Sequence, residues 1–474
     1  MPTTITPDAW AAATAATESA VSPAGTFHPW LAEQARRSPM DVQRRPLDAL
    51  EGWSTDPRTG DIRHHSGGFF RVGGLSVRHD GAAVPRWDQP IIHQPEVGVL
   101  GLLVKEFDGV PHALVQAKVE PGNHNHHQLS PTVQATRSNY TRLHGGRAVP
   151  YLEYFRERGR GRIVADVRQS EQGAWFYRKR NRNVVVAVTE DVELLEGFRW
   201  LPIGRLHQLL REGDFVNMDT RTVLSCLPLT SPSDPPARPA GPDTGFLAAL
   251  ARSDSAGAEP LHRDEDVLSW ITDRRAAEPL LTRTVPLNSL ASWHRTPDRL
   301  HHERGHFFDV IGVRVSADRE VASWDQPMLA PRETGVAAFV VRRFEGTLHV
   351  LGKLRFEPGY ADVAEIGPTV QCAPGNHSHL PARDRPSFLE TVLAADPSAI
   401  RYDGTLSEEG GRFHHARNRY LVIEADVSPG DVPDGESYRW LTLAQLRGLL
   451  RHSHYLNIQA RTLVACLGGL LTPG

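Results

Sequence analysis

The segment EPGNHNHHQLSPTVQATRSNYTRLHGG, residues 120–146, carries the side chains of this chain that are best suited to chemistry. Its three closely spaced histidines, His124, His126 and His127, are of the type that binds zinc or iron or carries protons. The run 134–142 then supplies amides, hydroxyls, a tyrosine and two arginines. Amides and hydroxyls recognise an uncharged base and sugar, and arginines hold a diphosphate through paired hydrogen bonds. The segment therefore indicates either a metal site or a nucleotide-sugar site.

Cleavage of a diphosphate is a third interpretation. A hydrolase of this kind usually holds Mg²⁺ with several carboxylates. The nearest acids in a helical pattern are Glu153 and Glu157, a single i, i+4 pair, and neither half of the chain has a helix dense in glutamate. The sequence also lacks GxGxxG and GxxxxGK[ST], the signatures of dinucleotide-binding folds and P-loops. These observations favour the nucleotide-sugar interpretation.

The motifs around this segment occur twice in the chain, so a repeated domain must position them. Four motifs return 237 residues later: WDQP at 87–90 and 324–327, EPG at 120–122 and 357–359, PTVQ at 131–134 and 368–371, and RNR at 180–182 and 417–419. Towards the end of the units the separation becomes 240 residues, as for Cys226 and Cys466. Such a constant separation predicts two copies of one whole domain. The second copy has Tyr360-Ala-Asp-Val363 in place of the histidine cluster, and this weakens the metal interpretation.

We expect repeat one at residues 25–228 and repeat two at 262–470. The connecting residues 229–261 begin with LTSPSDPPARPAGPDTG, whose proline, serine and glycine content is typical of a linker. Residues 1–24 lack the basic start and the apolar core of a signal peptide, so we expect a poorly ordered tail.

Each repeat mixes strands with a few helices, which predicts an α+β domain. The strongest local signal is Asp108-Gly109, which predicts a hairpin of residues 97–107 and 112–120, and Glu345-Gly346 stands at the matching turn. Further strands are expected at 132–136 and 183–188. Helices are expected around Trp30 and its counterpart Trp270, and near 151–158. Two helices close each repeat: the first has Leu206, Leu209 and Leu210 on one face, matched by Leu446, Leu449 and Leu450, and the last carries Arg221 and Cys226.

Strand alternation assigns the polar side chains to one face of the sheet. Gln116, Lys118 and Glu120 share one face of their strand, and Gln134 lies on the polar face of the next. A solvent-exposed face is the simpler interpretation of this pattern. Continued alternation would bury Arg137, so we expect a bulge or a strand end at 135–137, a feature often found beside functional sites.

Composition excludes several other classes of protein. A net charge of −3 gives no field that would recruit nucleic acid. No apolar run approaches the length of a membrane span. Three widely separated cysteines argue against a disulfide framework and fit a reducing cytoplasm.

Residues 115–155, VQAKVEPGNHNHHQLSPTVQATRSNYTRLHGGRAVPYLEYF, resemble the nucleoside-diphosphate-hexose 2,3-dehydratases of deoxysugar biosynthesis. Both WDQP motifs and the second-copy run EPGYADVAEIGPTVQC support the resemblance, which covers nearly the whole chain outside the tail and the linker. It implies a fold similar to that of Nudix hydrolases, duplicated within one chain and without their glutamate helix. It also implies action on dTDP-4-keto-6-deoxyglucose, on the way to the 2,6-dideoxy sugars of antibiotics.

The implied reaction needs an acid, a base and no redox cofactor. A base removes the C3 proton that the C4 ketone acidifies, donors stabilise the enolate, and an acid assists loss of the C2 hydroxyl. Tautomerisation then gives a 3,4-diketo sugar for a separate 3-ketoreductase. The alternatives are a non-catalytic nucleotide-sugar-binding protein and a Nudix-type diphosphate hydrolase.

Repeat one alone carries the ATRSNYTR run, so we expect its site to do the chemistry. The candidate catalytic residues are Tyr140 or His127 as acid or base, Glu120 as base, and Lys118 to polarise the ketone. The candidate substrate-binding residues, with Arg137 and Arg221 on the diphosphate and Trp87 near the base or sugar, are Trp87, Gln116, Gln128, Ser130, Thr132, Gln134, Thr136, Arg137, Ser138, Asn139, Arg142, Arg180, Asn217 and Arg221. Trp87 has core packing as its alternative, because both repeats share its motif.

Repeat two is expected to hold an auxiliary nucleotide-sugar site or to be a structural twin. Its corresponding residues are Trp324, Lys353, Glu357, Glu365, Gln371, Asn457 and Arg461. We expect no metal ligands, no cofactor, no membrane partner and no nucleic acid, and the family suggests a homodimer.

Overall fold

The computed structural model describes residues 16–472 except 81, 83, 126, 138–147, 158, 229–243, 256, 318–322 and 433–436. Four predicted site residues, Ser138, Asn139, Tyr140 and Arg142, lie outside the described residues. Their roles stay predictions.

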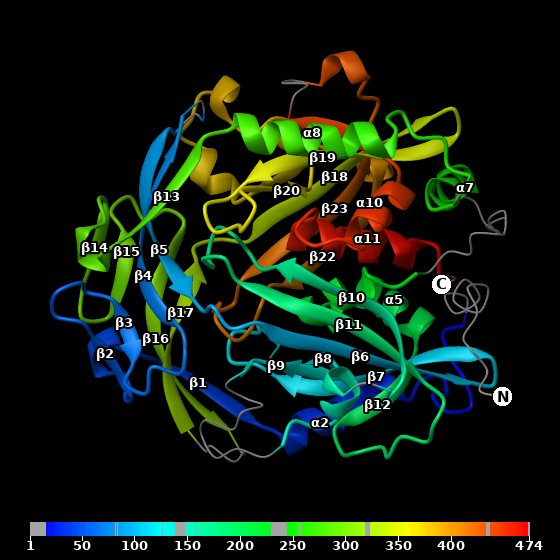
Figure 1. The fold of residues 1–474 in the computed structure, drawn as a ribbon, viewed down its shortest axis with the longest axis horizontal. Helices are drawn as coiled ribbons and strands as arrows, with labels where there is room; N and C mark the ends of the chain where they lie inside the picture. The colour runs from blue at the N-terminus through cyan, green and yellow to red at the C-terminus, as the bar shows by residue number, and fades with distance from the viewer. Residues whose placement is uncertain are drawn as a thin grey trace.

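Each repeat is built on a mixed seven-stranded sheet with the same strand order (Figure 1). In repeat one the order is β10-β11-β6-β7-β12, with β8 beside β7 and β9 beside β6. The strands are β6 (Gly98–Phe107), β7 (Val110–Val119), β8 (His127–Pro131), β9 (Val133–Ala135), β10 (Arg162–Ser170), β11 (Arg180–Val188) and β12 (Phe198–Pro202). Their counterparts in repeat two are β18 (Gly335–Phe344), β19 (Thr347–Phe356), β20 (Ala364–Gly367), β21 (Val370–Cys372), β22 (Ile400–Ser407), β23 (Arg417–Glu424) and β24 (Tyr438–Leu441). The predicted tandem α+β architecture is confirmed.

The predicted hairpin is the centre of each sheet. Asp108 and Gly109 have φ values of 49° and 80°, and Glu345 and Gly346 have 48° and 80°. Two consecutive positive φ values twist the chain in the sense that joins β6 to β7 and β18 to β19 directly. The neighbouring strands β6 and β11 run parallel, so the chain must cross over between them. β9 ends at Ala135, where a strand end was expected.

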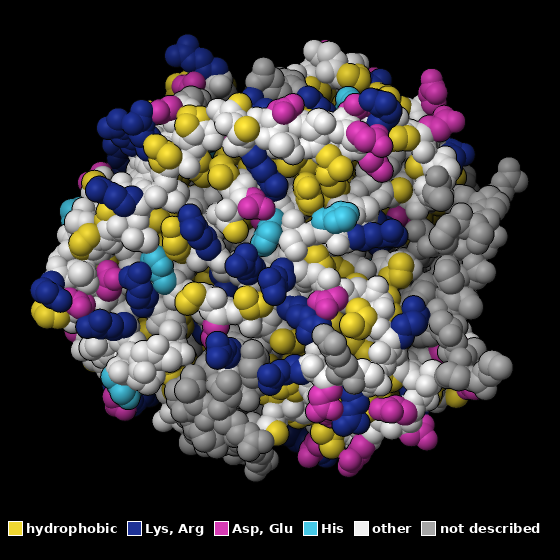
Figure 2. Space-filling model, viewed as in Figure 1, with side chains coloured by type: hydrophobic (Ala, Val, Ile, Leu, Met, Phe, Trp, Pro, Cys, Tyr) yellow, Lys and Arg dark blue, Asp and Glu magenta, His cyan; other side chains and the backbone are white. Residues whose placement is uncertain are grey.

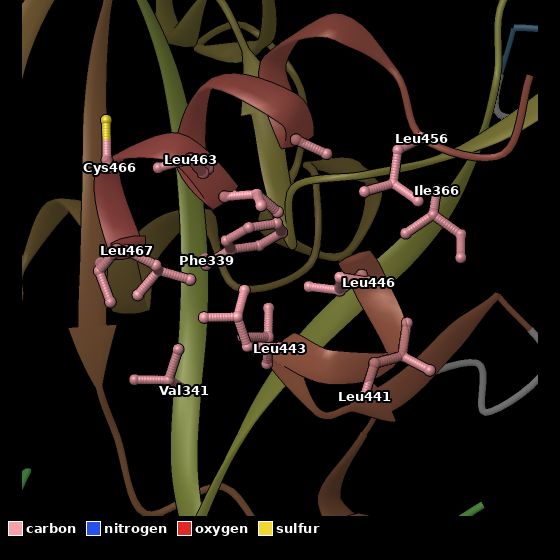
Figure 3. Close-up of a cluster of buried hydrophobic side chains, with 14 of the residues drawn as sticks. Phe339, Val341, Ile366, Leu441, Leu443, Leu446, Leu456, Leu463, Cys466 and Leu467 are labelled. Carbon is pink, nitrogen blue, oxygen red and sulfur yellow. The ribbon is translucent and has the colours of Figure 1, made fainter. Parts of the chain in front are cut away.

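Helices cover both faces of the two sheets. They are α2 (Phe27–Arg37), α4 (Glu153–Arg156), α5 (Ile203–Glu212), α6 (Met218–Leu224), α7 (Thr244–Ser253), α8 (Asp264–Ala277), α9 (Leu389–Leu393), α10 (Leu443–Leu450) and α11 (Ile458–Leu470). The predicted apolar face of α5 is buried, since Leu206, Leu209 and Leu210 are at most 1% exposed. Figure 3 shows Phe339 of β18 among leucines of α10 and α11 in the core of repeat two. Helix α7 begins inside the predicted linker and adds Phe246 to this core.

Two smaller sheets join the repeats by exchanging strands. β1 (Met40–Arg45) of repeat one pairs along its whole length with β16 of repeat two, and β13 (Leu280–Val285) of repeat two pairs with β4 of repeat one. The remaining strands are β2 (Trp53–Thr55), β3 (Ile62–His64), β4 (Arg71–His79) and β5 (Arg86–His93) in one sheet, and β14 (Trp293–Arg295), β15 (Arg299–His302), β16 (Phe308–Ala317) and β17 (Ser323–Pro331) in the other. The exchange gives each guest strand a hydrogen-bonded partner in the other repeat, so the two repeats share one core.

The last helices also cross between the repeats. Helix α5 of repeat one packs against α11 of repeat two. A Cβ atom on Gly469 would lie 2.9 Å from the carbonyl oxygen of His207, so this contact needs a glycine. No helix in the described part of the chain is long and apolar enough to span a membrane.

Candidate functional site

The Glu-Pro-Gly turn of each repeat lies against a loop of the other repeat. Gly122 N donates a hydrogen bond to Gly410 O at 2.7 Å, and Gly359 N donates to Gly173 O at 2.7 Å. A Cβ atom at Gly122 or Gly359 would come within 1.8 Å or 1.9 Å of a backbone oxygen of the other repeat. The turn therefore requires glycine, and a loop of one repeat always forms part of the site of the other.

The WDQP motifs support these crossing loops. Gln89 Nε2 donates to Ala174 O at 2.6 Å, and Ala174 N donates to Glu357 Oε2 at 3.0 Å. In the other direction, Gln326 Nε2 donates to Gly411 O at 2.7 Å, next to the loop residue that meets the repeat-one turn. The glutamine of each WDQP motif thus holds the loop that contacts the Glu-Pro-Gly turn of the opposite repeat.

A short relay of amides ends on the glutamate of each turn. In repeat one, Asn217 Nδ2 donates to Gln134 Oε1 at 3.0 Å, and Gln134 Nε2 donates to Glu120 Oε1 at 2.8 Å. Asn217 Oδ1 is itself fixed because it caps α6 by accepting from Thr220 N. Lys118 Nζ lies 3.4 Å from Glu120 Oε1. The structure brings these four predicted residues, Lys118, Glu120, Gln134 and Asn217, together.

Repeat two has the same relay. Asn457 Nδ2 donates to Gln371 Oε1 at 2.8 Å, and Gln371 Nε2 donates to Glu357 Oε1 at 3.3 Å. Arg355 takes the place of Lys118 and donates to Glu357 Oε1 at 2.6 Å. The relay is therefore a property of the shared scaffold.

Repeat one has a cluster of four acids around the relay, which we name the acid cluster: Glu120, Glu171, Asp219 and Glu409. Glu120 and Glu171 have the acidic counterparts Glu357 and Glu408 in repeat two, so Asp219 and Glu409 are what distinguishes repeat one. Glu120, Glu171 and Asp219 are buried, and Glu409 comes from the repeat-two loop and is half-buried. Burial raises the pKa of Asp219 well above its ordinary value, and the charges of the other three acids raise it further. Burial and the neighbouring Glu120 raise the pKa of Glu409 to about 7. The acid cluster therefore holds protons near neutral pH.

Nearby cations balance this charge. They are Lys118, Lys179, Arg412 and Arg461, of which Arg412 and Arg461 belong to repeat two. Lys179 Nζ donates to Glu96 O at 2.6 Å, and burial lowers the pKa of its amine. Arg412 stacks over the ring of Phe70 at 4.2 Å. Paired charges of both signs make the buried cluster tolerable.

Repeat two replaces the extra charges with neutral groups. Gln172 stands where repeat one has Glu409, Gln459 replaces Asp219, and Ala416 replaces Lys179. Both amides donate to Glu408 Oε2, at 2.9 and 3.0 Å. The polar cluster of repeat two is therefore tied to one buried carboxylate.

Asn123 and Tyr360 occupy the same position after the two turns. The ring of Tyr360 is buried, and a Cβ atom on Gly173 would lie 2.5 Å from it. Asn123 is 1% exposed, and neither polar atom of its side chain has a hydrogen-bond partner among the described residues. Buried amides normally find partners, so Asn123 and the similarly unpartnered Asp219 Oδ1 are suited to bind a polar ligand.

The histidine segment meets a second histidine pair from repeat two. The rings of His124 and His415 are in edge-on contact at 5.6 Å, and His414 stacks on His415 at 4.1 Å. Burial lowers the pKa of His414 to about 4. Within the described residues, no group of three or more His, Cys, Asp or Glu side chains is arranged to hold a metal ion.

Comparison with known proteins identifies the family. The family model for NDP-hexose 2,3-dehydratase matches the chain twice, at residues 24–227 and 264–467. This chain belongs to the NDP-hexose 2,3-dehydratase family. It is 50% identical to a dTDP-4-dehydro-6-deoxy-alpha-D-glucopyranose 2,3-dehydratase of Saccharopolyspora spinosa, over 95% of this chain and 93% of that protein. Proteins of the same name in Streptomyces violaceoruber and Amycolatopsis orientalis are 48% and 45% identical, over 93% and 92% of this chain and 96% and 88% of their own lengths.

In this 2,3-dehydratase, several predicted binding residues lie inside the scaffold. Thr132 is buried, accepts from Leu103 N at 2.9 Å and donates to Leu114 O, so it joins β6 to β7. Gln128 is fully buried and donates to Ser407 Oγ of repeat two at 3.2 Å. Its counterpart Glu365 accepts from Ser170 Oγ of repeat one at 2.5 Å. Both residues hold the two repeats together.

Arg221 and Arg461 form a second symmetric pair inside the dehydratase. Both are at most 1% exposed. Arg221 donates to the backbone oxygens of Val216 and Ser407, and Arg461 donates to those of Leu456 and Ser170. Each guanidinium therefore joins its own repeat to the other.

The other predicted residues lie nearer to solvent. Arg137 and Arg180 are exposed, and Gln116, Thr136, His127 and Lys353 are half-buried. Ser130 is buried and donates to Pro131 O at 3.2 Å. Lys353 Nζ lies 5.0 Å from the centre of the Tyr438 ring.

Trp87 lines an open groove of about 510 Å³ between β4, β5 and the exchanged strand β13, together with Arg78, Arg86 and Arg283. Figure 2 shows basic side chains over this part of the face and further towards its centre. Trp87 Nε1 donates to Gln89 Oε1 at 2.8 Å, and Gln89 holds the loop that contacts the repeat-two turn. Trp324, in contrast, belongs to the motif that supports the repeat-one site; its Nε1 donates to Gln326 Oε1 at 2.9 Å.

Six polar residues of the site were not predicted from the sequence: Asn123, Glu171, Lys179, Asp219, Glu409 and Arg412. Glu409 and Arg412 were missed because they reach the site from the other repeat. A signal existed, however. Where the repeats are aligned, Gln172 faces Glu409 and Gln459 faces Asp219, so amides in one copy stand against acids in the other. Such a difference within an otherwise shared scaffold marks the positions that could give the copies different chemistry.

Proposed function

We propose that this dehydratase removes water across C2–C3 of dTDP-4-keto-6-deoxy-D-glucose to give a 3,4-diketo-2,6-dideoxy nucleotide sugar, and that repeat one performs the chemistry. The observation that carries the second part is the acid cluster, since repeat two has amides in place of Asp219 and Glu409. The relatives that cover nearly the whole chain, and the activity that their names state, support the first part.

The reaction begins at C3. Glu120 takes the C3 proton, because it is held by Gln134 on one oxygen and lies beside the Lys118 ammonium. Lys118 polarises the C4 ketone, so the negative charge that develops on the C4 oxygen faces a cation. The resulting enolate expels the C2 hydroxyl, which needs a proton to leave as water.

The product of this elimination is an enol at C2–C3. Its tautomerisation moves a proton from the C3 hydroxyl to C2 and leaves ketones at C3 and C4. No net oxidation occurs, since the ketone at C3 arises from the lost hydroxyl at C2. Asn123 is suited to hold one of the ring hydroxyls, because its buried amide has both a donor and an acceptor to offer.

The surroundings of the reaction follow from the family resemblance. A 3-ketoreductase would take the diketo product onward to a 2,6-dideoxy sugar of the kind found on antibiotics. We also infer a Nudix-like fold for each repeat, a homodimer and a cytoplasmic location. Repeat two would serve as an auxiliary nucleotide-sugar site or a structural twin.

The purified protein should be incubated with the 4-keto sugar nucleotide, a 3-ketoreductase and its reduced cofactor. We expect a product that has lost one oxygen at C2, measured by mass spectrometry and NMR. A substrate deuterated at C3 should lose its label to water. Binding of the nucleotide sugar without any 2-deoxy product would favour a binding protein instead, and release of a hexose phosphate would favour a hydrolase.

A further inference from the structure

The leaving hydroxyl at C2 needs a proton donor, and the acid cluster offers one from the opposite repeat. Glu409 is the first residue of a turn that crosses into the repeat-one site. The next residue, Gly410, lies so close to the turn of repeat one that an added Cβ atom would be 2.9 Å from the Cβ of Glu120 and 2.2 Å from Asn123 Oδ1. Glu409 therefore stands one residue from a fixed contact with Glu120.

The Glu409 carboxylate is itself held in place. Gly411 N donates to its Oε1 at 2.9 Å, and Arg412 N donates to its Oε2 at 2.7 Å. The turn that presents these donors is anchored by the hydrogen bond from Gly122 to Gly410 and by that from Gln326 to Gly411. A half-buried acid on an anchored turn keeps one position relative to Glu120.

Charged groups from the neighbouring elements act on Glu409 or on the charged groups beside it. They are Glu120 and Lys118 of β7, Glu171 and Lys179 of the β10–β11 connection, Asp219 of α6, Arg461 of α11, Glu96 before β6, and Arg412 of its own turn. With Glu409 itself, five acids stand against four cations. Since like charges this close cannot all ionise, the cluster retains protons at a pH where an isolated glutamate would have lost its own.

We propose that Glu409 of repeat two is the general acid of the repeat-one site, and that it donates its proton to the C2 oxygen as the C2–O bond breaks. This inference rests on the proposed function. The C3 proton passes to Glu120, the C–H electron pair forms the enolate, and the C2–O electron pair leaves with the oxygen as water. Transfer of the proton from Glu120 to Glu409 then restores the starting state.

Repeat two itself offers the contrast for this assignment. Gln172 is the counterpart of Glu409 and cannot donate as an acid, and its amide is engaged by Glu408 at 2.9 Å. The burial that raises the pKa of Glu409 to about 7 keeps a large fraction of this acid protonated at neutral pH. A general acid works best when its pKa lies near the working pH.

The test compares two leaving groups in Glu409→Gln, the substitution that copies repeat two. With the natural substrate we expect kcat to fall by on the order of 10²–10⁴-fold with a similar KM. With the 2-fluoro analogue of the 4-keto sugar nucleotide, fluoride leaves without a proton, so fluoride release should fall by less than about tenfold. Wild-type kcat should decline as pH rises through about 7, where Glu409 loses its proton, and Glu409→Gln should lack this decline.

The control is Glu390→Gln. Glu390 lies on α9 and forms an ion pair with Arg385, which precedes the helix, and this variant should behave like wild type. Equal losses on both substrates, or full activity of Glu409→Gln with hydroxyl loss, would overturn the assignment while leaving the dehydratase function in place. If wild type forms neither 2-deoxy product nor fluoride, the proposed function itself fails. Should Glu409→Gln not fold, the wild-type pH profile and Glu409→Asp decide: a missing decline near pH 7, or an unchanged kcat in Glu409→Asp, would reject the assignment.

Discussion

The two turns that follow β7 and β19 share a scaffold and differ in charge. In both turns a glutamate accepts a hydrogen bond from a glutamine, which in turn accepts one from an asparagine. In both turns a glycine also lies in close contact with the backbone of the other repeat. Repeat one surrounds its glutamate with three further acids, Glu171, Asp219 and Glu409. Repeat two keeps an acid, Glu408, at the position of Glu171, but has Gln459, Gln172 and Ala416 in place of Asp219, Glu409 and Lys179.

The residues common to both repeats and the residues found only in the repeat-one site differ in their interactions. The groups found in both repeats make hydrogen bonds that end on backbone atoms or on each other, which is how a scaffold is specified. The groups found only in repeat one are titratable, buried and close to one another, which is how an acid–base site is made. We therefore expect the unshared positions to decide which of the two turn glutamates takes part in turnover, and the remaining shared positions to govern stability.

The largest effect should come from the two turn glutamates. Glu120→Gln removes the proposed base, so kcat should fall by about 10²–10⁴-fold while the fold is kept. Glu357→Gln should leave kcat little changed but cost about 1–2 kcal/mol of unfolding free energy, because Glu357 accepts from Arg355 and from Ala174 N. Steady-state kinetics and urea unfolding measure the two. Equal kinetic losses in both variants would mean that the repeats share the chemistry.

The next effect should be the same in both repeats. Gly122→Ala and Gly359→Ala each place a methyl group within 2 Å of a backbone oxygen, at 1.8 and 1.9 Å. We expect each to lower the unfolding free energy by about 3 kcal/mol, since neither backbone can move without breaking the crossing hydrogen bonds. Gly448→Ala in α10 is the control: nothing lies within 4 Å of its added Cβ atom, and alanine favours a helix by roughly 1 kcal/mol. A large loss of unfolding free energy in only one of the two variants would show that the two turns are not structurally equivalent.

The aspartates of the two WDQP motifs, Asp88 and Asp325, should differ moderately in their contribution to the free energy of unfolding. Asp325 accepts from Glu51 N at 2.8 Å and Arg314 Nε at 2.7 Å, and its side chain is fully buried. Asp88 accepts from Ala291 N at 3.1 Å and is half-buried. Asp325→Asn should therefore cost about 2–3 kcal/mol and Asp88→Asn about 0.5 kcal/mol. Thermal unfolding of both variants checks the order, and the reverse order would contradict it.

The last effect is absent at neutral pH and appears only in acid. His207 of α5 is fully buried, and burial lowers its pKa to about 4, whereas its counterpart in repeat two is Arg447, paired with Asp254 at 2.7 Å. A histidine with a lowered folded-state pKa stabilises the fold fully above about pH 6.5 and loses this contribution as pH falls towards 4. In that window His207→Gln should reduce the slope of unfolding free energy against pH by up to about 1.4 kcal/mol per pH unit. Parallel slopes for variant and wild type would contradict this.

Local patterns in the sequence were enough for the hairpins, the closing helices and the duplication. Asp108-Gly109 and Glu345-Gly346 determine their turns through backbone conformation alone, and Leu206, Leu209 and Leu210 define a buried helix face through spacing alone. Lys118, Glu120, Gln134 and Asn217 could be proposed together because strand alternation and the repeated motifs point to them. They do lie together in the structure.

Strand exchange and the crossing loops needed the tertiary structure. A strand such as β1 carries the same alternation whichever edge it joins, so its sequence cannot name its partner. The sequence by itself determined that there are two copies and what each copy is made of. Only the tertiary structure decided that Glu409 and Arg412 of one copy complete the site of the other, because burial and charge pairing depend on which surfaces meet.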